Sequence, residues 1–524
     1  MAALALFVSL GVVVILTFRD FGITWDEPLH AVYGELVLSW YRSLFQDRRA
    51  LSYEDLRFYG PLFDVAVQLA TRVSPLGDLE TRHLMNALFG LAGIAATYGL
   101  GALIGGPRAG FLGALLLALS PTYAGHAFAN PKDVPFAALQ TLALACVLRA
   151  GREVPRISRR HVMVTGLALG ASMAVRVGGV VTFGYLLLHW GIRLAVATRA
   201  TPRGRRLRDV AGVAASAAAV GGIAWATMVA SWPWAQVAPV QGPLEALRVA
   251  ARFPLNVPVL FAGKTIASTD VPWTYLPTWF GITIPELHLA LLAAGAVVLL
   301  WRSFRGPLDP ALLLDVACVA LAAVLPIAIA IALGAVLYDA HRHFLFVFPL
   351  VAALAGSSAS ALLQAPRRWV RVATWAVLGL GCAAVLTDMA QLHPYEYVYF
   401  NRTIAGGLPG SAGRFETDYW GASYREGVEW VISRYGRDSL ARPLRVANCS
   451  STALTQYWIE QDPVAKQRFE AVGPGEAPPD LFLATTRFDC HLQGRAPIHV
   501  VERQGTPLLY VFSLTSPPEP APTR

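Results

Sequence analysis

The stretch "ALALFVSLGVVVILTFRDFGITWDEPLH", residues 3–30, places an unbroken apolar run directly before a polar segment with two adjacent acids. A membrane-spanning helix needs roughly 17–25 mostly apolar residues, and the run from Ala2 to Phe18 meets that requirement. The run lacks a basic segment at its start and a small-residue cleavage site, so we expect a retained first membrane helix rather than a removed signal peptide. Asp26 and Glu27 then lie where the chain leaves the membrane.

The composition extends this reading to the whole chain. Of 524 residues, 55% are hydrophobic and only 15% are charged, whereas soluble proteins carry about 25% charged residues. The net charge of +9 comes from arginines in short clusters between apolar segments. That pattern is typical of cytoplasmic loops, and no basic segment is interleaved with aromatics as in a nucleic-acid-binding surface. We therefore expect a multispan membrane protein with membrane lipids as its surroundings and no nucleic acid partner.

The apolar segments predict a polytopic α-helical membrane protein with about eleven transmembrane helices. They lie near residues 2–18, 82–104, 108–127, 134–150, 161–176, 179–198, 210–231, 286–301, 311–337, 344–364 and 370–388. Because arginines favour the cytoplasmic side, the arginine-rich loops orient the chain in a cytoplasmic (inner) membrane. The opposite, extracytoplasmic face then carries two long loops, 19–81 and 232–285, and everything after residue 388.

After about residue 389 the sequence becomes more polar. We predict a transmembrane domain over 1–388, a small extracytoplasmic α/β domain over 389–514 and a disordered tail over 515–524. An amphipathic helix is expected at 423–435. Strand-like runs follow at 444–449, 480–486, 497–503 and 507–513, and the last two flank "QGT" and predict a hairpin.

The five cysteines divide by location. Cys146, Cys318 and Cys382 fall in predicted spans and are expected to pack in the core. Cys449 and Cys490 both fall in the outer domain, where an oxidising compartment permits a disulfide. Pairing depends on the distance between their Cα atoms, which the sequence leaves open.

The segment "TWDEPLH", residues 24–30, has two compatible interpretations. In the first, Thr24 caps a helix and Glu27 reaches back to the cap amide, which leaves Asp26 unexplained. In the second, Asp26 accepts a proton from a nucleophile at the membrane surface. An aspartate buried beside an acid and an aromatic is expected to have a raised pKa. His30 lies one turn after Asp26 on the same helical face.

A second constellation is "NPKD", residues 130–133. Asn-Pro forms turns, and Asp133 is placed to cap the helix that follows. The predicted topology nevertheless puts Asp133 on the same membrane face as Asp26. Lys132 and His126 lie beside it, so a substrate-binding role stays open.

Several basic side chains occupy the outer ends of spans, where charge is costly and usually paired. They are Arg82, Arg176 and Arg342, the last flanked by His341 and His343. Ion pairs with nearby acids would explain them, and so would an anionic ligand, because guanidinium groups suit phosphate. In the second outer loop, Trp273 and Tyr275 fit either an interfacial aromatic belt or a surface that stacks on a sugar. No metal-binding or phosphate-loop motif occurs.

These segments together resemble the membrane-embedded GT-C glycosyltransferases, most closely the protein O-mannosyltransferase and aminoarabinose-transferase type. The matching stretches are Asp26-Glu27, "YGPL" at 59–62, "TRHLMNALFG" at 81–90, "NPKDVP" at 130–135 and "HRHFLFVFP" at 341–349. They cover roughly residues 1–390. The chain departs from the family by lacking the doubled proline near residue 61 and by carrying His341 and His343.

The resemblance implies a GT-C fold and a sugar donor linked to polyprenyl phosphate. By motif, Asp26 is the expected catalytic base, with Glu27 as its partner. Donor phosphate binding falls to Arg82, Arg342 and Arg176. Substrate contacts fall to His30, Lys132, Asp133, His126, His341, His343, Trp273 and Tyr275. No cofactor is certain, and the involvement of a divalent metal stays open.

The expected reaction is transfer of a sugar to an acceptor hydroxyl or amine on a protein, lipid or glycan. Phosphate is a good leaving group, so a base and positive charge suffice, and one displacement inverts the anomeric centre. A multispan transporter or flippase is the main alternative, although such proteins tend to show internal repeats and none is convincing here. A membrane scaffold for the outer domain is a third possibility.

Overall fold

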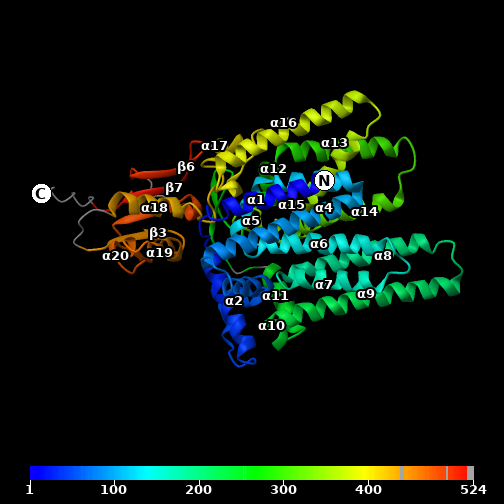
Figure 1. Ribbon diagram of the computed structural model, residues 1–524, viewed down its shortest axis with the longest axis horizontal. Coiled ribbons are helices and arrows are strands. Elements are labelled where there is room, and N and C mark those ends of the chain that lie inside the picture. Colours follow the sequence, from blue (N-terminus) through cyan, green and yellow to red (C-terminus); the bar gives the residue numbers. More distant parts are fainter. Residues whose placement is uncertain (252, 254, 437–441, 491–493, 516–524) are drawn as a thin grey trace.

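The protein, in a computed structural model, is a bundle of long helices with a small sheet domain at one end (Figure 1). The structure describes residues 1–251, 253, 255–436, 442–490 and 494–515. The predicted tail, 515–524, therefore lies outside the described residues except for its first position. The predicted membrane protein with a C-terminal α/β domain is confirmed.

The apolar segments form the bundle. Its helices are α1 (Ala2–Thr17), α4 (Asp78–Ala118), α6 (Asp133–Gly151), α7 (Arg159–Met173), α8 (Val181–Ala197), α9 (Arg203–Ser231), α13 (Glu286–Ser303), α14 (Pro310–Leu333), α15 (Val347–Leu363) and α16 (Arg368–Leu392). Seven helical stretches in the described part of the chain are long and apolar enough to cross a membrane; α1 and α15 are apolar but shorter. The total number of spans stays a prediction.

One predicted span, 108–127, is wrong as a single helix. The long helix α4 bends at Gly106, whose φ of 81° a glycine adopts without strain, and ends at Ala118. A separate short helix, α5 (Pro121–Ala129), follows. Pro121 cannot donate the backbone hydrogen bond that would continue α4, so the chain breaks before it.

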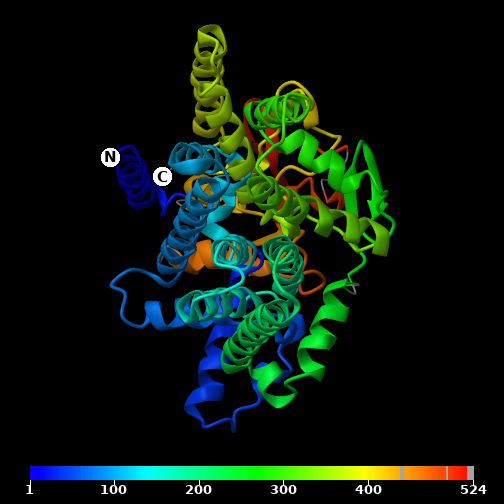
Figure 2. The ribbon, with the colours of Figure 1, turned by 90° about the vertical axis from the view of Figure 1, so that its right-hand side faces the viewer.

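Close contact between α4 and α15 forms the centre of the bundle. A Cβ added to Gly356 would lie 2.3 Å from the backbone nitrogen of Gly113, so the two backbones touch where both residues are glycine. Small residues permit such an approach between membrane helices. By contrast, α1 lies at the edge of the bundle with mostly exposed apolar side chains (Figure 2), as expected for a surface in contact with lipid.

The arginine-rich loops lie at the end of the bundle away from the sheet domain (Figure 1). There, Asp315 of α14 is buried and paired with three bases. Its carboxylate lies 2.9 Å from Arg152, 2.6 Å from Arg193 and 2.8 Å from His189. One buried carboxylate thus joins α14 to α8 and to the end of α6.

The other end of the bundle carries the two long segments expected as outer loops, and both are structured. The first contains α2 (Glu27–Arg42), η1 (Arg49–Leu51), η2 (Glu54–Phe58) and α3 (Leu62–Thr71). The second contains α10 (Pro233–Val237), α11 (Gln241–Ala251), the hairpin of β1 (Pro258–Phe261) and β2 (Lys264–Ala267), and α12 (Tyr275–Thr283). The hairpin turn, Ala262-Gly263, has positive φ at both residues, as a tight two-residue connection requires.

The C-terminal domain is a five-stranded sheet in the order β4-β3-β5-β7-β6. Its strands are β3 (Leu444–Asn448), β4 (Phe469–Val472), β5 (Leu481–Thr485), β6 (His499–Arg503) and β7 (Thr506–Ser513). Its helices are α18 (Tyr424–Tyr435), α19 (Thr452–Gln461) and α20 (Ala465–Arg468). The predicted helix and the hairpin of β6 and β7 are present, whereas β4 was not predicted. Cys449 and Cys490 form a disulfide.

Candidate active site

The turn before α2 holds Asp26 and Glu27 in different roles. A carboxylate oxygen of Glu27 accepts hydrogen bonds from the backbone N–H of Thr24, at 2.8 Å, and from its hydroxyl, at 3.0 Å. The other oxygen of Glu27 lies 3.1 Å from His83. Glu27 therefore reaches back to the amide of Thr24 as the capping interpretation predicted, but the cap position of α2 is Asp26 and not Thr24. The side chain of Asp26 makes no capping hydrogen bond and is available to other partners.

Those partners are cations from two other segments. Oδ2 of Asp26 lies 2.7 Å from Nζ of Lys132 and 3.4 Å from Nη1 of Arg342. Lys132 comes from the turn before α6, and Arg342 opens the short helix η4 (Arg342–Phe344). All three side chains are buried. Motifs separated by more than 300 residues thus meet at one point.

Asp133 joins the same network because it is the first residue of α6 and its side chain is not used as a helix cap. The side-chain oxygen of Asn130 accepts hydrogen bonds from the backbone N–H groups of Asp133, at 2.8 Å, and Lys132, at 3.3 Å. The carboxylate of Asp133 is then available to Arg176, with which it is ion-paired, and to Nη1 of Arg342 at 3.5 Å. The turn interpretation, with Asp133 as the cap of α6, is therefore wrong, because Lys132 is at the cap position and Asp133 is the first residue of the helix.

A third carboxylate, Asp339, completes the network. One of its oxygens lies 2.8 Å from Nη2 of Arg342, and the other lies 2.7 Å from Nη2 of Arg487. Arg487 belongs to the C-terminal domain, which the sequence left without a functional assignment. No local pattern around residue 487 marks it as a site residue.

The network has an excess of positive charge. Lys132, Arg176, Arg342 and Arg487 face Asp26, Asp133 and Asp339, which leaves one net positive charge. Nearby Glu416 is buried, and burial together with Asp339 raises its pKa to about 8 against the opposing effect of Arg487, so it is mainly neutral at pH 7. A buried excess of positive charge is suited to an anion.

The predicted raised pKa of Asp26 is wrong. Burial alone would raise it, but Lys132 and Arg342 together outweigh burial and hold the pKa of Asp26 well below its usual range. The sequence places Glu27 and Trp25 beside Asp26, whereas the fold adds two cations from distant segments. In this structure Asp26 is therefore a carboxylate ion.

Arg82 and His30 are held by partners outside this network. Arg82 pairs with Asp78 one turn earlier in α4, at 2.8 Å. It also lines a small cavity beside Glu27. His30 lies 3.0 Å from Asp64. Of the three arginines expected at the donor phosphate, Arg342 contacts both Asp26 and Asp133, and Arg176 contacts Asp133. Arg82 pairs with Asp78 instead.

The remaining predicted residues surround the network at different depths. Nε2 of His126 lies 3.1 Å from the hydroxyl of Tyr419, and Nε2 of His341 lies 3.1 Å from that of Thr283. Tyr275 is buried against Phe261 of the β1–β2 hairpin. Trp273 is 70% exposed, which fits an interfacial position better than a closed sugar site.

An apolar cavity of about 580 Å³ opens beside the network. Its walls come from α8, α11, α14 and the segment between α14 and α15. Arg176, His343 and Tyr59 contribute polar groups to the lining. Arg176 therefore contacts both the cavity and Asp133. An apolar cavity that ends at the ion-paired guanidinium of Arg176 is suited to a ligand with a long apolar chain and an anionic head group.

The carboxylates of the site do not fit a divalent metal ion. Asp26, Asp133 and Asp339 are each engaged by basic side chains. Within residues 1–515, apart from the undescribed positions, no three His, Cys, Asp or Glu side chains gather as metal ligands.

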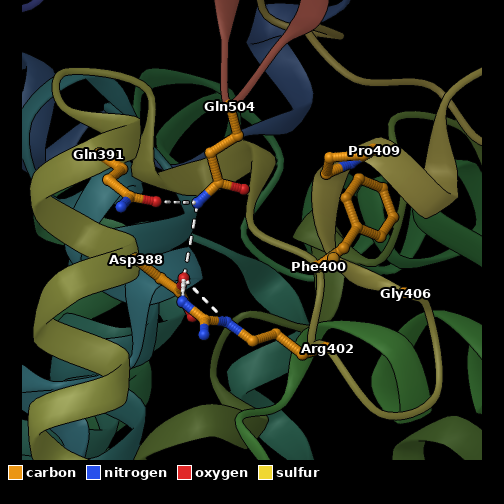
Figure 3. A pocket seen from close by; sticks show the side chains of 8 residues that line it. Asp388, Gln391, Phe400, Arg402, Gly406, Pro409 and Gln504 are labelled. Atoms are coloured by element: carbon orange, nitrogen blue, oxygen red, sulfur yellow. Dashed lines mark hydrogen bonds and ion pairs between the residues drawn. The ribbon is translucent and has the colours of Figure 1, made fainter.

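A second cavity, of about 630 Å³, lies between the end of α16, the loop around Gly406 and the β6–β7 hairpin (Figure 3). Its arginine, Arg402, is paired with Asp388 at 2.5 Å, and Gln504 bonds Gln391 at 3.0 Å. None of the predicted site residues lines it.

The chain is similar to several solved structures. ArnT from Cupriavidus metallidurans bound to undecaprenyl phosphate is 16% identical, with 97% of each chain covered and a TM-score of 0.49. The archaeal oligosaccharyltransferase AglB from Archaeoglobus fulgidus, in complex with an inhibitory peptide and a dolichol-phosphate, is 13% identical, covers 92% of this chain and 69% of its own, and has a TM-score of 0.48. The arabinofuranosyltransferase AftD from Mycobacteria is 13% identical, with 97% and 41% covered and a TM-score of 0.43. No protein-family model and no curated protein matches the chain.

Proposed function

We propose that this protein is an integral-membrane glycosyltransferase that uses a polyprenyl-phosphate-linked sugar. The observation that carries the proposal is a cation-rich network, built around a carboxylate, at the edge of an apolar cavity. A sugar phosphodiester of a polyprenol has one negative charge, which the single net positive charge of the network balances. The polyprenyl chain has an apolar chamber to occupy.

Donor binding would raise the pKa of Asp26, the proposed base. Lys132 and Arg342 contact Asp26 in this structure, and the same cations are the nearest partners for a phosphate. When they turn toward the phosphate, they stabilise Asp26 less, and its pKa rises toward a value useful for accepting a proton. The base would thus gain strength only when the donor is in place.

The proposed chemical step is one displacement. The acceptor oxygen or nitrogen forms a bond to the anomeric carbon, and the bond from that carbon to the phosphate oxygen breaks with its electron pair on the phosphate. The acceptor proton passes to Asp26. Arg342 and Arg176 stabilise the charge that develops on the leaving phosphate. Attack from the face opposite the phosphate inverts the anomeric configuration.

The active site is proposed to face the extracytoplasmic side of a cytoplasmic membrane. The arginine-rich loops lie at the end of the bundle away from the start of α2, where Asp26 is the cap (Figure 1), and such loops favour the cytoplasm. The acceptor would be a protein, lipid or glycan that reaches the network from that side.

The test supplies purified protein in lipid vesicles with a panel of radiolabelled polyprenyl-phosphate sugars and membrane extracts as acceptors. We expect label from one donor to move to an acceptor with inverted configuration. A product with retained configuration would contradict the single-base scheme. Movement of intact donor lipid across the bilayer without transfer would favour a flippase.

A further inference from the structure

Arg487 is the one cation of the described network that the C-terminal domain supplies. It is 3% exposed although its domain lies outside the bundle. Its Nε and Nη2 lie 2.9 Å and 2.7 Å from the same oxygen of Asp339. Its guanidinium carbon lies 4.5 Å from the ring centre of Trp25, the residue before Asp26. The outer domain therefore reaches the neighbours of the proposed base directly.

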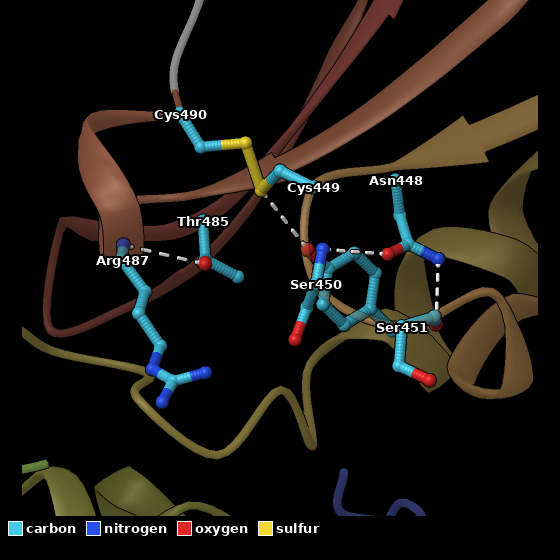
Figure 4. The surroundings of a disulfide bond; sticks show 8 residues. Asn448, Cys449, Ser450, Ser451, Thr485, Arg487 and Cys490 are labelled. Atoms are coloured by element: carbon cyan, nitrogen blue, oxygen red, sulfur yellow. Dashed lines mark hydrogen bonds between the residues drawn. A yellow bond between two sulfur atoms is a disulfide. The ribbon is translucent and has the colours of Figure 1, made fainter. Parts of the chain in front are cut away.

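Two anchors fix the turn that carries Arg487. The residue follows strand β5 at the start of η6 (Arg487–Asp489), and its backbone N–H donates to the hydroxyl of Thr485 at 3.4 Å. The turn ends at Cys490, whose disulfide to Cys449 ties it to the end of β3. Figure 4 shows the Arg487 side chain pointing away from this disulfide. The sheet and the disulfide thus hold the backbone while the side chain extends toward Asp339.

The sharing of Asp339 has an electrostatic consequence. Arg487 binds one of its oxygens, and Arg342 binds the other while also directing Nη1 toward Asp26 and Asp133. Without Arg487, the full charge of Asp339 would act on Arg342 alone. A buried carboxylate that loses a cation attracts the remaining one more strongly. Arg342 would then be less available to an incoming phosphate.

We propose that Arg487 is a positioning residue that neutralises part of Asp339 and so keeps Arg342 available to the donor phosphate. The C-terminal domain is in consequence a component of the donor site, with the Cys449–Cys490 disulfide as the support of its contributing turn. This inference rests on the proposed function, since it concerns the same phosphate site.

The test measures binding of polyprenyl phosphate without sugar, so that its readout is separate from transfer. We expect Arg487→Gln to weaken the Kd for this lipid by about 10- to 100-fold, the usual size of a coupling that acts on a ligand through a second residue. Arg487→Lys keeps the charge and loses the two-nitrogen contact, so an intermediate Kd is expected. The matched control is Arg442→Gln, which removes an arginine paired with Asp480 within the same domain and should leave the Kd unchanged.

A double substitution separates positioning from folding. Arg487→Gln with Asp339→Asn removes both members of the pair, so Arg342 is no longer drawn to an unbalanced carboxylate, and the Kd should recover by several-fold relative to Arg487→Gln alone. Replacing both Cys449 and Cys490 with alanine should weaken the Kd in the same direction. Thermal unfolding of each variant reports on folding independently.

The outcomes distinguish this inference from the proposed function. A wild-type Kd in Arg487→Gln, or a loss that Asp339→Asn deepens rather than relieves, would overturn the role of Arg487. Tight lipid binding by the wild type, but no transfer from any donor, would overturn the proposed function and leave the role of Arg487 to be judged by the Kd values. Absence of lipid binding by the wild type would overturn both.

Discussion

Asp26 is a buried acid whose charge is stabilised from two directions at once. Lys132 approaches it from the turn before α6, and Arg342 approaches it from η4, so the carboxylate is ionised and held in one orientation. Glu27 does not compete for these cations, because its oxygens are engaged by Thr24 and His83. The two adjacent acids therefore have different roles. Glu27 stabilises the turn before α2, and Asp26 contacts Lys132 and Arg342.

Replacing Asp26 with asparagine keeps its shape and removes its capacity to accept a proton. We expect sugar transfer by Asp26→Asn to fall by about 10²–10⁴-fold, the usual contribution of a general base. Binding of polyprenyl phosphate should stay equal or become tighter, since Lys132 and Arg342 lose a competing anion. The control is Asp270→Asn, an exposed acid on the same end of the bundle. Equal losses of transfer and lipid binding in Asp26→Asn would contradict its role as base.

Glu416 gives the site a pH dependence. Its pKa is raised to about 8 by burial and by Asp339, with Arg487 acting in the opposite direction. A carboxyl whose pKa is higher in the folded state contributes stability at low pH and loses it as pH rises from 4.5 to about 8. We expect Glu416→Gln to be more stable than the wild type at pH 8, by on the order of a few kcal/mol.

The measurement for Glu416 is thermal unfolding in detergent at a series of pH values. The melting temperature of the wild type should fall relative to Glu416→Gln as the pH rises from 5 to 8.5. The matched control, Glu429→Gln, changes an exposed glutamate of α18 and should follow the wild type. A constant difference between the wild type and Glu416→Gln across this range would show that the buried carboxyl does not titrate there.

At the scale of the elements, Asp315 holds the arginine-rich end of the bundle together. Its single carboxylate contacts Arg152 after α6 and both His189 and Arg193 of α8. We expect Asp315→Asn to lower the free energy of unfolding by about 3–5 kcal/mol, because three bases lose a buried counter-charge. Asp309→Ala at the start of α14 removes only a helix cap and should cost about 1 kcal/mol.

Lipid binding checks that this effect is confined to stability. The start of α14, which carries Asp315, and the start of α2, which follows Asp26, lie at opposite ends of the bundle (Figure 1). The Kd of folded Asp315→Asn for polyprenyl phosphate should therefore equal that of the wild type at a temperature well below unfolding. If Asp315→Asn unfolds no earlier than Asp309→Ala, the three contacts add no stability.

The features that the sequence predicts correctly are those set by residues close together along the chain. The helices of the bundle were predicted because each rests on a local run of apolar residues, and the β6–β7 hairpin because its turn is local. The break before Pro121 was missed although proline marks it, because hydropathy continues through it. Arg176 and Arg342 were singled out because charge at a span end is unusual. Nothing local distinguishes Arg487, whose partner lies 148 positions earlier, and the pKa of Asp26 depends on cations from distant segments.

At the scale of the whole molecule, His393 connects the bundle to the outer domain. Its Nδ1 lies 2.7 Å from Glu396 and its Nε2 lies 3.0 Å from Asp20, just after α1. Its backbone carbonyl accepts a hydrogen bond from Nε of Arg503 in the sheet domain, at 3.1 Å. One histidine at the end of α16 thus contacts the segment after the first helix and the last hairpin of the chain.

The charge of His393 makes this connection sensitive to pH. Glu396 and Asp20 raise its pKa to about 9 against the opposing effect of burial. A histidine whose pKa is higher in the folded state contributes stability that is complete below pH 6.5 and is lost as pH rises through about 9. His393→Gln keeps hydrogen-bonding capacity without the charge. The melting temperature of the wild type should therefore exceed that of His393→Gln by several degrees at pH 6.5 and approach it at pH 9.5. Taking the difference between the two proteins removes the contribution of Glu416, which both share. The same difference at pH 6.5 and pH 9.5 would mean that His393 does not titrate between these pH values and would contradict the prediction.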